Sequence, residues 1–462
     1  MPRLRVGRIG RDGNPEPAEP PSPTQHTPAA IAAPANIPNA SRDDRDLIER
    51  VQARLISEME EGGQQASQYN QRISTLVGEE LERGGRLVPE RERARIARLA
   101  QFELLGFGPL EELLADDSIS EIMVNGPNQI WVERGGKIVE SNVRFADEDH
   151  VRRIIDRIIA PLGRRCDETS PMVDARLPDG SRVNVIIPPL CLNGPTLTIR
   201  KFSKKPLKAQ DLITRGSASA ELVEFLRACV ISRINVVVAG GTGTGKTTML
   251  NVLSSFIPAD ERIITIENAA EIQLQQRHVV TLESRAANVE GRGEISMRDL
   301  VINSLRMRPD RIVVGECRAG ETLDMLQAMN TGHDGSMTTL HANSPRDAIR
   351  RMETMVLMSG MDLPIRAIRE QIASAVDLIV QLERMQDGSR RITQVTEIVG
   401  LENDVVAMQD LFVFQHQGMR DGKIAGKIIP TGLRPQFMDQ IQQHNLSLSP
   451  QIFGSNGLPF KS

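Results

Sequence analysis

The strongest constraint on the fold is a glycine-rich segment near the middle of the chain. It runs Gly240-Gly-Thr-Gly-Thr-Gly-Lys246-Thr247, after an apolar β-branched run at 234–239 and before an apolar helical pattern at 249–256. This order of strand, G-x-x-x-x-G-K-T and helix is the context that a phosphate-binding loop requires. We therefore expect the segment to bind the phosphates of a nucleoside triphosphate. The alternative, a glycine-rich turn without a ligand, leaves the complete motif unexplained.

Each part of this loop has an expected role. Glycines let the backbone turn tightly and approach an anion closely, and N–H groups of the loop and of the helix N-terminus then point at the phosphates. Lys246 is expected to reach the β- and γ-phosphates, and Thr247 to place its hydroxyl on Mg²⁺. The predicted nucleotide-binding residues of the loop are Gly240, Gly241, Thr242, Gly243, Thr244, Gly245, Lys246, Thr247 and Thr248.

Acidic residues follow two further apolar runs. The run 312–315 ends at Glu316, which would face Mg²⁺ or its water, and the run 263–266 ends at Glu267, with Glu271 four residues later. Glu267 is the first candidate for the general base that polarises the attacking water, because ligands lie at the ends of strands in such sheets. Glu271 is the second candidate. The alternatives are a buried strand end for Glu316 and solvated charges on a turn for the other two.

Two histidines flank a short apolar run. His333 and His341 lie on either side of 334–340, and we expect both at the sheet edge that faces the nucleotide. There an imidazole can sense the γ-phosphate by hydrogen bonding. A zinc site is disfavoured, because no cysteine or carboxylate shares their spacing in a zinc pattern.

Composition limits the function classes. Hydrophobic residues make up 40% of the chain and charged residues 25%, which is typical of a globular protein. The formal net charge of −4 and the 3% content of aromatic residues oppose a nucleic-acid partner. The four cysteines form no C-x-x-C pair, so neither zinc nor redox chemistry is indicated. No apolar run approaches the ~20 residues that span a bilayer.

Periodicity divides the chain into segments. We expect a disordered Pro-rich arm at 1–40, a bundle of three helices at 41–105, a small α+β domain at 106–205, a linker at 206–220, an α/β domain at 221–410 and a C-terminal extension at 411–462. Apolar runs alternating with helical patterns in the fifth segment predict a mostly parallel sheet with ligands at the carboxyl ends of its strands. The run 390–400 is expected to form an edge hairpin.

Together, and in this order, these motifs resemble the secretion and pilus ATPase family, which includes the motors of type II secretion, type IV pili and type IV secretion. The loop ending in Lys246-Thr247 resembles its Walker A motif, and Val314-Gly-Glu316 with Arg318 resembles its atypical Walker B motif. Glu267 to Glu271 resembles its Asp box, although Asn268 replaces an acid. Thr331-Gly-His333 to His341-Ala-Asn343 resembles its His box.

Other segments are similar to one branch, the tight-adherence (Tad/Flp) pilus ATPases of the CpaF type. They are Gly106-Phe-Gly-Pro-Leu110, Ile122-Met-Val-Asn-Gly126, the run 172–182, Leu305-Arg-Met-Arg-Pro-Asp310, the run 325–335 and the run 367–374. The resemblance covers about residue 45 to the end. It implies a cytoplasmic, Mg²⁺-dependent ATPase of this fold: a RecA-like domain preceded by a small α+β, PAS-like domain and a helical bundle.

The resemblance also implies partners and further site residues. The expected assembly is a homo-oligomer, a hexamer in this family, that acts at the inner membrane through platform proteins. Arg176, Arg182 and Arg200 match the arginine-bearing strands of the family's N-terminal domain, where an arginine can neutralise charge on the γ-phosphate; Arg318 is expected near the nucleotide. Simple ion pairs are the alternative for each arginine.

Two other functions stay open. One is a type IV secretion, conjugation-type or other DNA-associated translocation ATPase, which the acidic net charge and the few aromatic residues oppose. The other is a nucleotide-binding scaffold without hydrolysis, which the presence of Glu267, Glu271 and Glu316 opposes.

Overall fold

A computed structural model describes residues 40–60, 68–202, 206–285, 287 and 292–454. The chain divides into two compact units, Met1–Leu104 and Leu105–Ser462, which are described separately. The Pro-rich arm expected at 1–40 lies outside the described residues except for its last position.

The first unit is built from three helices, α1 (Arg42–Glu60), α2 (Tyr69–Arg83) and α3 (Glu90–Leu105). Their apolar faces form one buried cluster that includes Val51, Ile73 and Ile96. Ser41 and Asp44 form a capping box at the start of α1. The Ser41 N–H donates to Asp44 Oδ2 at 3.2 Å, and the Asp44 N–H donates to Ser41 Oγ at 3.1 Å.

An antiparallel sheet with one long helix begins the second unit. Its strands lie in the order β3-β2-β1-β6-β5-β4. The apolar stripe of α5, which includes Val151, Ile154 and Ile158, packs on one face of this sheet and forms its core. The elements are α4 (Leu110–Ala115), β1 (Ile119–Asn125), β2 (Ile130–Arg134), β3 (Lys137–Glu140), α5 (Glu148–Ile159), η2 (Ala160–Leu162), β4 (Met172–Arg176), β5 (Arg182–Ile186) and β6 (Thr196–Arg200).

A nine-stranded mixed sheet forms the centre of the second domain of this unit, in the order β15-β14-β13-β12-β7-β11-β10-β8-β9. The six strands from β12 to β9 are parallel, and β13, β14 and β15 add to them in antiparallel pairs. The strands are β7 (Val236–Gly240), β8 (Ile263–Glu267), β9 (Val279–Glu283), β10 (Arg311–Val314), β11 (Met337–Leu340), β12 (Leu378–Arg384), β13 (Arg390–Glu402), β14 (Val405–Arg420) and β15 (Lys423–Pro430).

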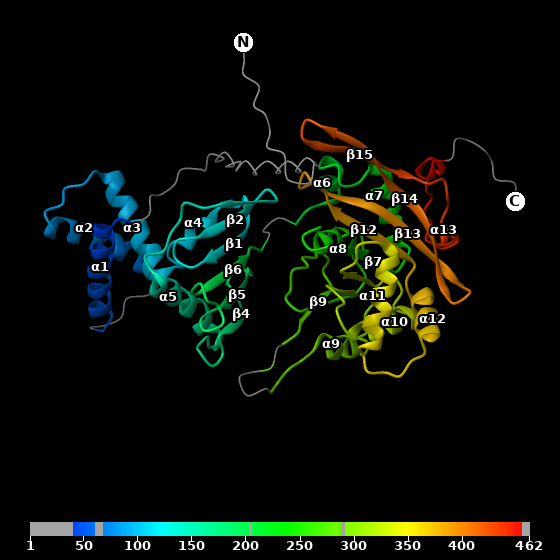
Figure 1. The fold of residues 1–462 in the computed structure, drawn as a ribbon, viewed down its shortest axis with the longest axis horizontal. Helices are drawn as coiled ribbons and strands as arrows, with labels where there is room; N and C mark the ends of the chain where they lie inside the picture. The colour runs from blue at the N-terminus through cyan, green and yellow to red at the C-terminus, as the bar shows by residue number, and fades with distance from the viewer. Residues whose placement is uncertain (1–39, 61–67, 203–205, 286, 288–291, 455–462) are drawn as a thin grey trace, which may run out of the picture. The chain divides into compact units, whose positions relative to one another are not determined.

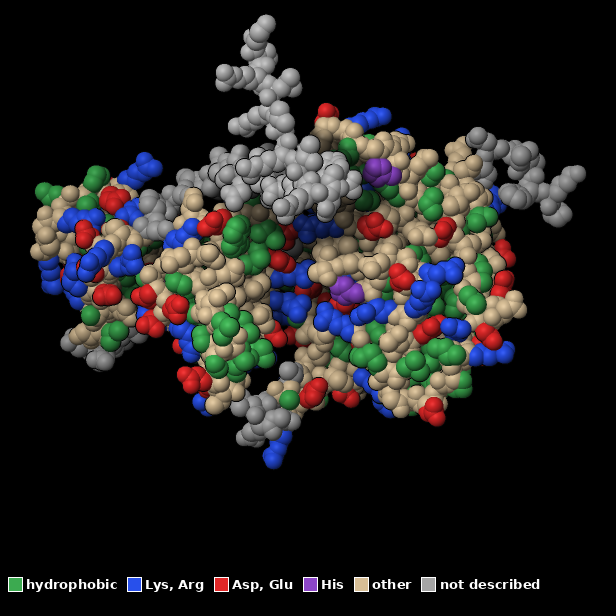
Figure 2. Space-filling view, in the orientation of Figure 1, with side chains coloured by type: hydrophobic (Ala, Val, Ile, Leu, Met, Phe, Trp, Pro, Cys, Tyr) green, Lys and Arg blue, Asp and Glu red, His purple; other side chains and the backbone are tan. Residues whose placement is uncertain are grey.

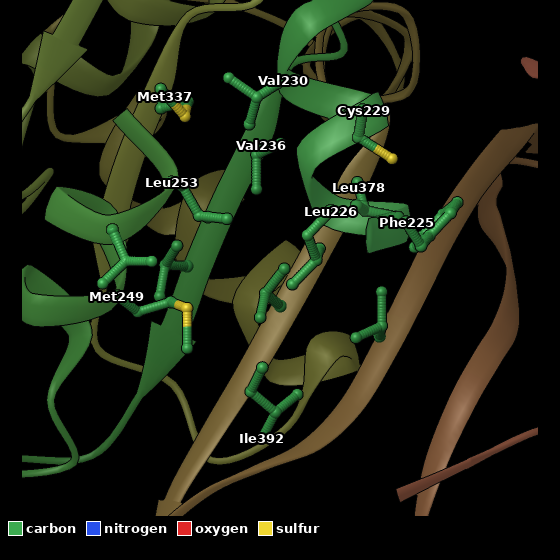
Figure 3. Close-up of a cluster of buried hydrophobic side chains, with 14 of the residues drawn as sticks. Phe225, Leu226, Cys229, Val230, Val236, Met249, Leu253, Met337, Leu378 and Ile392 are labelled. Atoms are coloured by element: carbon green, nitrogen blue, oxygen red, sulfur yellow. The ribbon is translucent and has the colours of Figure 1, made fainter. Parts of the chain in front are cut away.

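Helices cover both faces of this sheet, because side chains of a buried strand alternate between the faces. Val236 and Val238 of β7 contact one cluster, while Val237 and Ala239 contact the other. Figure 3 shows the first cluster, in which Phe225 and Met249 reach towards the sheet from two helices. The helices are α6 (Ala209–Thr214), α7 (Ala220–Ile231), α8 (Lys246–Ser254), α9 (Met297–Ser304), α10 (Glu321–Asn330), α11 (Pro345–Leu357), α12 (Ile365–Ala375), α13 (Met438–Gln443) and η3 (Pro450–Phe453).

The C-terminal part differs from the sequence prediction. β13 is not at an edge, because β14 and β15 continue the sheet as the long ribbon visible in Figure 1. β14 also crosses the expected boundary between residues 410 and 411. Phe453 closes the core beyond it, since it is 1% exposed and its ring lies 5.6 Å from that of Phe225. The segment expected as a linker contains α6 and the first residue of α7.

Candidate active site at the phosphate loop

The glycine-rich segment connects β7 to α8, as its motif predicts. Gly240 leaves no room for a side chain: an added Cβ would lie 2.6 Å from Thr244 Oγ1 and 2.7 Å from the Leu382 carbonyl oxygen. Gly243 and Gly245 have φ angles of 70° and 93°, a region that glycine adopts without strain. The loop therefore turns directly into the N-terminus of α8, where backbone N–H groups favour anions.

Lys246 is the first residue of α8 and is only 8% exposed. Its ammonium donates to the Gly241 carbonyl at 3.0 Å, and it lies 3.4 Å from both ring nitrogens of His341. Burial lowers the pKa of Lys246, while the charge of Glu316 opposes that shift. A phosphate entering this loop would meet a cation that is already buried and folded against it.

Glu316 lies two residues beyond the end of β10. Its Oε2 accepts a hydrogen bond from Arg318 at 2.7 Å. Its Oε1 lies 3.0 Å from His341 Nε2 but accepts no hydrogen bond, although it is buried. An unsatisfied carboxylate oxygen close to Lys246 and to the loop can accept a cation or a water.

Glu267 lies in a buried environment that favours its neutral form. Glu267 ends β8 and is 3% exposed, and its Oε1 accepts from the backbone N–H groups of Glu271 and Ile272 at 2.9 and 3.1 Å. Burial raises the pKa of Glu267 to about 7 against these two hydrogen bonds. A Cβ on Gly315 would lie 2.8 Å from Glu267 Cγ, so the glycine before Glu316 makes room for this side chain.

A row of charges crosses the sheet of the α+β domain. Arg176 pairs in register with Arg182, Arg182 with Arg200, and Arg200 with Glu121. Register partners lie side by side on one face, where adjacent like charges destabilise a sheet unless anions compensate them.

Carboxylates of the domain with the nine-stranded sheet compensate two of these arginines. Arg182 contacts Glu271 at 3.0 Å, and Arg176 contacts Glu283 at 2.9 Å. Arg200 lies 3.7 Å from Glu121 and is near enough to Lys246 to help lower its pKa. The structure therefore places Arg176 and Arg182 against acids, and Arg200 within electrostatic reach of Lys246. Figure 2 shows Lys and Arg side chains gathered around a histidine near the middle of the face drawn.

The two predicted histidines lie at opposite ends of β11. His341 follows the strand, whose Leu340 pairs with Ala239 of β7, and so reaches Lys246 and Glu316. Burial and the charge of Lys246 lower the pKa of His341 against the charge of Glu316. His333 precedes the strand. The expectation that it faces the nucleotide edge is wrong, because residues before and after a strand lie at opposite edges of the sheet.

Three residues near the loop were missed in the sequence. Arg390 donates to the Gly243 carbonyl at 2.8 Å, and Arg384 also lies next to Gly243. Both arginines approach Glu133 of β2. The neighbourhood follows from the pairing of β12 with β7, in which Leu382 lies opposite Gly240. The Asp387-Gly388 turn signals only that the two arginines face each other across a hairpin, not that this hairpin lies beside the loop.

Within the described ranges, no group of three or more His, Cys, Asp or Glu residues is arranged to hold a metal ion. None of the helices described is long and apolar enough to cross a membrane.

Residues 103–422 match the protein family described as "Type II/IV secretion system protein". The chain belongs to this family. A putative conjugal transfer protein of Mycobacterium tuberculosis is 38% identical over 317 residues, which cover 67% of this chain and 90% of that protein. The conjugal transfer protein TrbB of Rhizobium radiobacter is 33% identical over 296 residues, covering 63% and 87%.

Solved structures of secretion ATPases are also similar to this chain. The VirB11 ATPase of the Brucella suis type IV secretion system is 30% identical, covers 62% of this chain and 94% of its own, and gives a TM-score of 0.35. The family assignment rests on the sequence match. The family is one of ATPases, and the α/β fold with its phosphate loop agrees with that activity.

Proposed function

We propose that this chain hydrolyses ATP, with Mg²⁺, as the motor of a type IV secretion or conjugation-type machine. The observation that carries the hydrolysis is the convergence of three side chains beside the phosphate loop. Lys246 Nζ lies 3.4 Å from His341 Nε2, and the same histidine nitrogen lies 3.0 Å from Glu316 Oε1. A scaffold that only binds nucleotide needs the loop and the lysine, but not an unsatisfied buried carboxylate beside them.

Different residues would have different roles in phosphoryl transfer. The loop N–H groups and Lys246 would hold the β- and γ-phosphates, and His341 would report the γ-phosphate by hydrogen bonding to it. Glu267 would take the proton of the attacking water, because a carboxyl with a pKa of about 7 is matched to proton transfer near neutral pH. Glu271 is the alternative base, and its pairing with Arg182 ties it to the α+β domain.

The residues present fit a magnesium ion. Thr247 in the first turn of α8 and the unsatisfied Oε1 of Glu316 are oxygen ligands of the kind Mg²⁺ prefers, and this ion usually takes its other ligands from waters and phosphates. When bound, the ion neutralises charge on the phosphate oxygens. Arg318 holds the other oxygen of Glu316 and so orients the carboxylate.

The arginines would act on the phosphate that is transferred. Arg182 and Arg200 are held on neighbouring strands as adjacent like charges, and a developing negative charge would compensate them better than their present half-buried carboxylate partners do. When nucleotide is bound, Arg182 would leave Glu271 and pair with a phosphate instead. This change of partner gives one physical route by which hydrolysis could move the α+β domain. A ring of six subunits acting on inner-membrane platform proteins is proposed from the family resemblance.

The names of the similar proteins favour a conjugation-type or type IV secretion machine. Their names are those of conjugal transfer proteins and of type IV secretion proteins. The motifs at 106–110 and 172–182 favour the second candidate, a tight-adherence pilus motor. The net charge of −4 supports a motor that moves protein subunits rather than one that grips DNA itself.

Phosphate release by the purified full chain with ATP and Mg²⁺ tests the hydrolysis. We expect Lys246→Ala to lower the rate at least about a hundredfold, the scale of losing a preorganised charge on the reacting phosphates. Lys427→Ala, at an exposed lysine of β15, is the matched control and should turn over like the parent. Equal rates in Lys246→Ala and the parent would refute the site.

A second assay separates the rival machines. We expect double-stranded DNA to leave the rate unchanged within about twofold at low salt, because the chain is acidic overall. Stimulation that falls steeply with added salt would instead identify a motor that contacts DNA directly.

A further inference from the structure

Two turns from different domains meet beside the phosphate loop. One is the Gly135-Gly136 turn between β2 and β3, and the other is the turn between β12 and β13. Arg384, at the end of β12, donates to the Gly136 carbonyl. Arg390, at the start of β13, donates to the Gly243 carbonyl at 2.8 Å. One guanidinium thus contacts the α+β domain and the other contacts the loop.

Glu133 of β2 joins these contacts. It is 9% exposed, and its Oε1 lies 3.5 Å from Arg390 and 3.9 Å from Arg384. Neither distance makes a hydrogen bond, and this oxygen accepts none although it is buried. A buried carboxylate is costly unless it is paired well. Glu133 therefore attracts both arginines but is only loosely satisfied by them.

The same two arginines border the loop itself. A Cβ on Gly243 would lie 3.6 Å from an Arg384 nitrogen, and a Cβ on Gly245 would lie 3.4 Å from Arg390 Cδ. Anything negatively charged that enters the loop would compete with Glu133 for these cations. The competition is in favour of the phosphates, because they carry more charge and can be gripped bidentately by a guanidinium.

We propose that Glu133 and Arg390 form a latch on the phosphate loop. Without nucleotide, Glu133 holds Arg390, and Arg390 holds the loop through Gly243. Nucleotide draws Arg390 and Arg384 away from Glu133 and releases the β2–β3 turn. Glu133 is then a positioning residue that opposes nucleotide binding, and Arg390 is one that favours it. The inference rests on the proposed binding of ATP to this loop.

A double-mutant cycle on the full chain tests the latch. Glu133→Gln keeps the shape but removes the competing charge, so the Kd for ATP should fall about threefold to tenfold, in the range of other close charge pairs. Arg390→Gln should raise the Kd by a similar factor. In the Arg390→Gln background, Glu133→Gln should tighten binding much less than it does alone. Glu140→Gln, at an exposed acid on the neighbouring strand β3, is the control and should leave the Kd unchanged.

The only tryptophan supplies an independent signal. Trp131 lies two residues before Glu133 on β2, so both side chains are on the same face of the strand. Emission from Trp131 should change when ATP is added to the parent, because Glu133 loses its partners. The change should be smaller in Glu133→Gln, which is already released. Glu224→Gln, at an exposed acid on α7, should respond like the parent.

The outcomes separate the latch from the proposed function. If the parent binds no ATP, or Lys246→Ala binds it as tightly, the nucleotide site itself is wrong. If the parent binds ATP but Glu133→Gln weakens binding or leaves it unchanged, the latch is wrong and the site stands. Additive effects in the cycle would also overturn the latch. Thermal unfolding of each variant checks that it is folded. Glu133→Asp keeps the charge, so it should bind ATP with parental affinity if Glu133→Gln acts through the loss of charge.

Discussion

Replacing Glu267 by glutamine should change how stability depends on pH. Burial raises the pKa of this carboxyl from 4.5 to about 7. Below about pH 4.5 the group is protonated in the folded and the unfolded chain, and as pH rises to about 7 only the unfolded chain releases the proton. The stabilising preference for the neutral form is therefore present at low pH and is lost as pH rises through the folded pKa.

The size of the effect follows from the shift. At about 1.36 kcal/mol per pKa unit, the parent loses up to about 3 kcal/mol through this window. Glutamine stays neutral and can still accept from the backbone N–H groups of Glu271 and Ile272. The variant should equal the parent near pH 4.5 and exceed its stability by up to about 3 kcal/mol near pH 8.

Urea unfolding followed by circular dichroism across this pH range measures the difference. Glu224→Gln, at an exposed acid on α7, is the matched control and should follow the parent at every pH. Parallel pH profiles for Glu267→Gln and the parent would show that Glu267 is ionised at no cost in the folded chain. The assignment of a near-neutral pKa to it would then be refuted.

Three further perturbations have defined outcomes. Glu316→Gln should lower phosphate release about a hundredfold while ATP binding, measured by equilibrium dialysis, stays within a few fold, and parental turnover would contradict its role. Gly315→Ala should destabilise the fold by about 1–3 kcal/mol in urea unfolding, because its Cβ would meet Glu267 Cγ at 2.8 Å; the loss should shrink when Glu267→Ala is combined with it. A colorimetric thiol reagent should modify Cys191 first, because the thiols of Cys166, Cys229 and Cys317 are buried and burial raises the pKa of each; fast reaction of a second thiol in the folded chain would contradict this burial.

Much of the fold follows from local patterns. Strand β8 ends at Glu267, where the apolar run 263–266 predicts a strand end. The phosphate loop was predictable because its motif is contiguous and each residue type in it answers a backbone or charge requirement.

What the sequence missed depends on the order of strands in the sheet. Arg384 and Arg390 lie beside the loop only because β12 pairs with β7, although about 140 residues separate them along the chain. Neither partner carries a local signal for that pairing. The error on His333 was avoidable, since it precedes β11 while His341 follows it. The burial of Glu267 and the contact of the half-buried Glu271 with Arg182 likewise depend on packing that periodicity does not report.

The central claim is that the α+β domain completes the catalytic site with Arg182 and Arg200. Steady-state phosphate release and ATP affinity of Arg182→Ala and Arg200→Ala, measured together on the assembled chain, test it most directly. We expect the rate to fall about tenfold to a thousandfold with little change in affinity, and lysine to restore it only in part because it lacks the planar guanidinium fork. Parental turnover in both variants would contradict the claim and leave these arginines as ion-pair partners of Glu271 and Glu121.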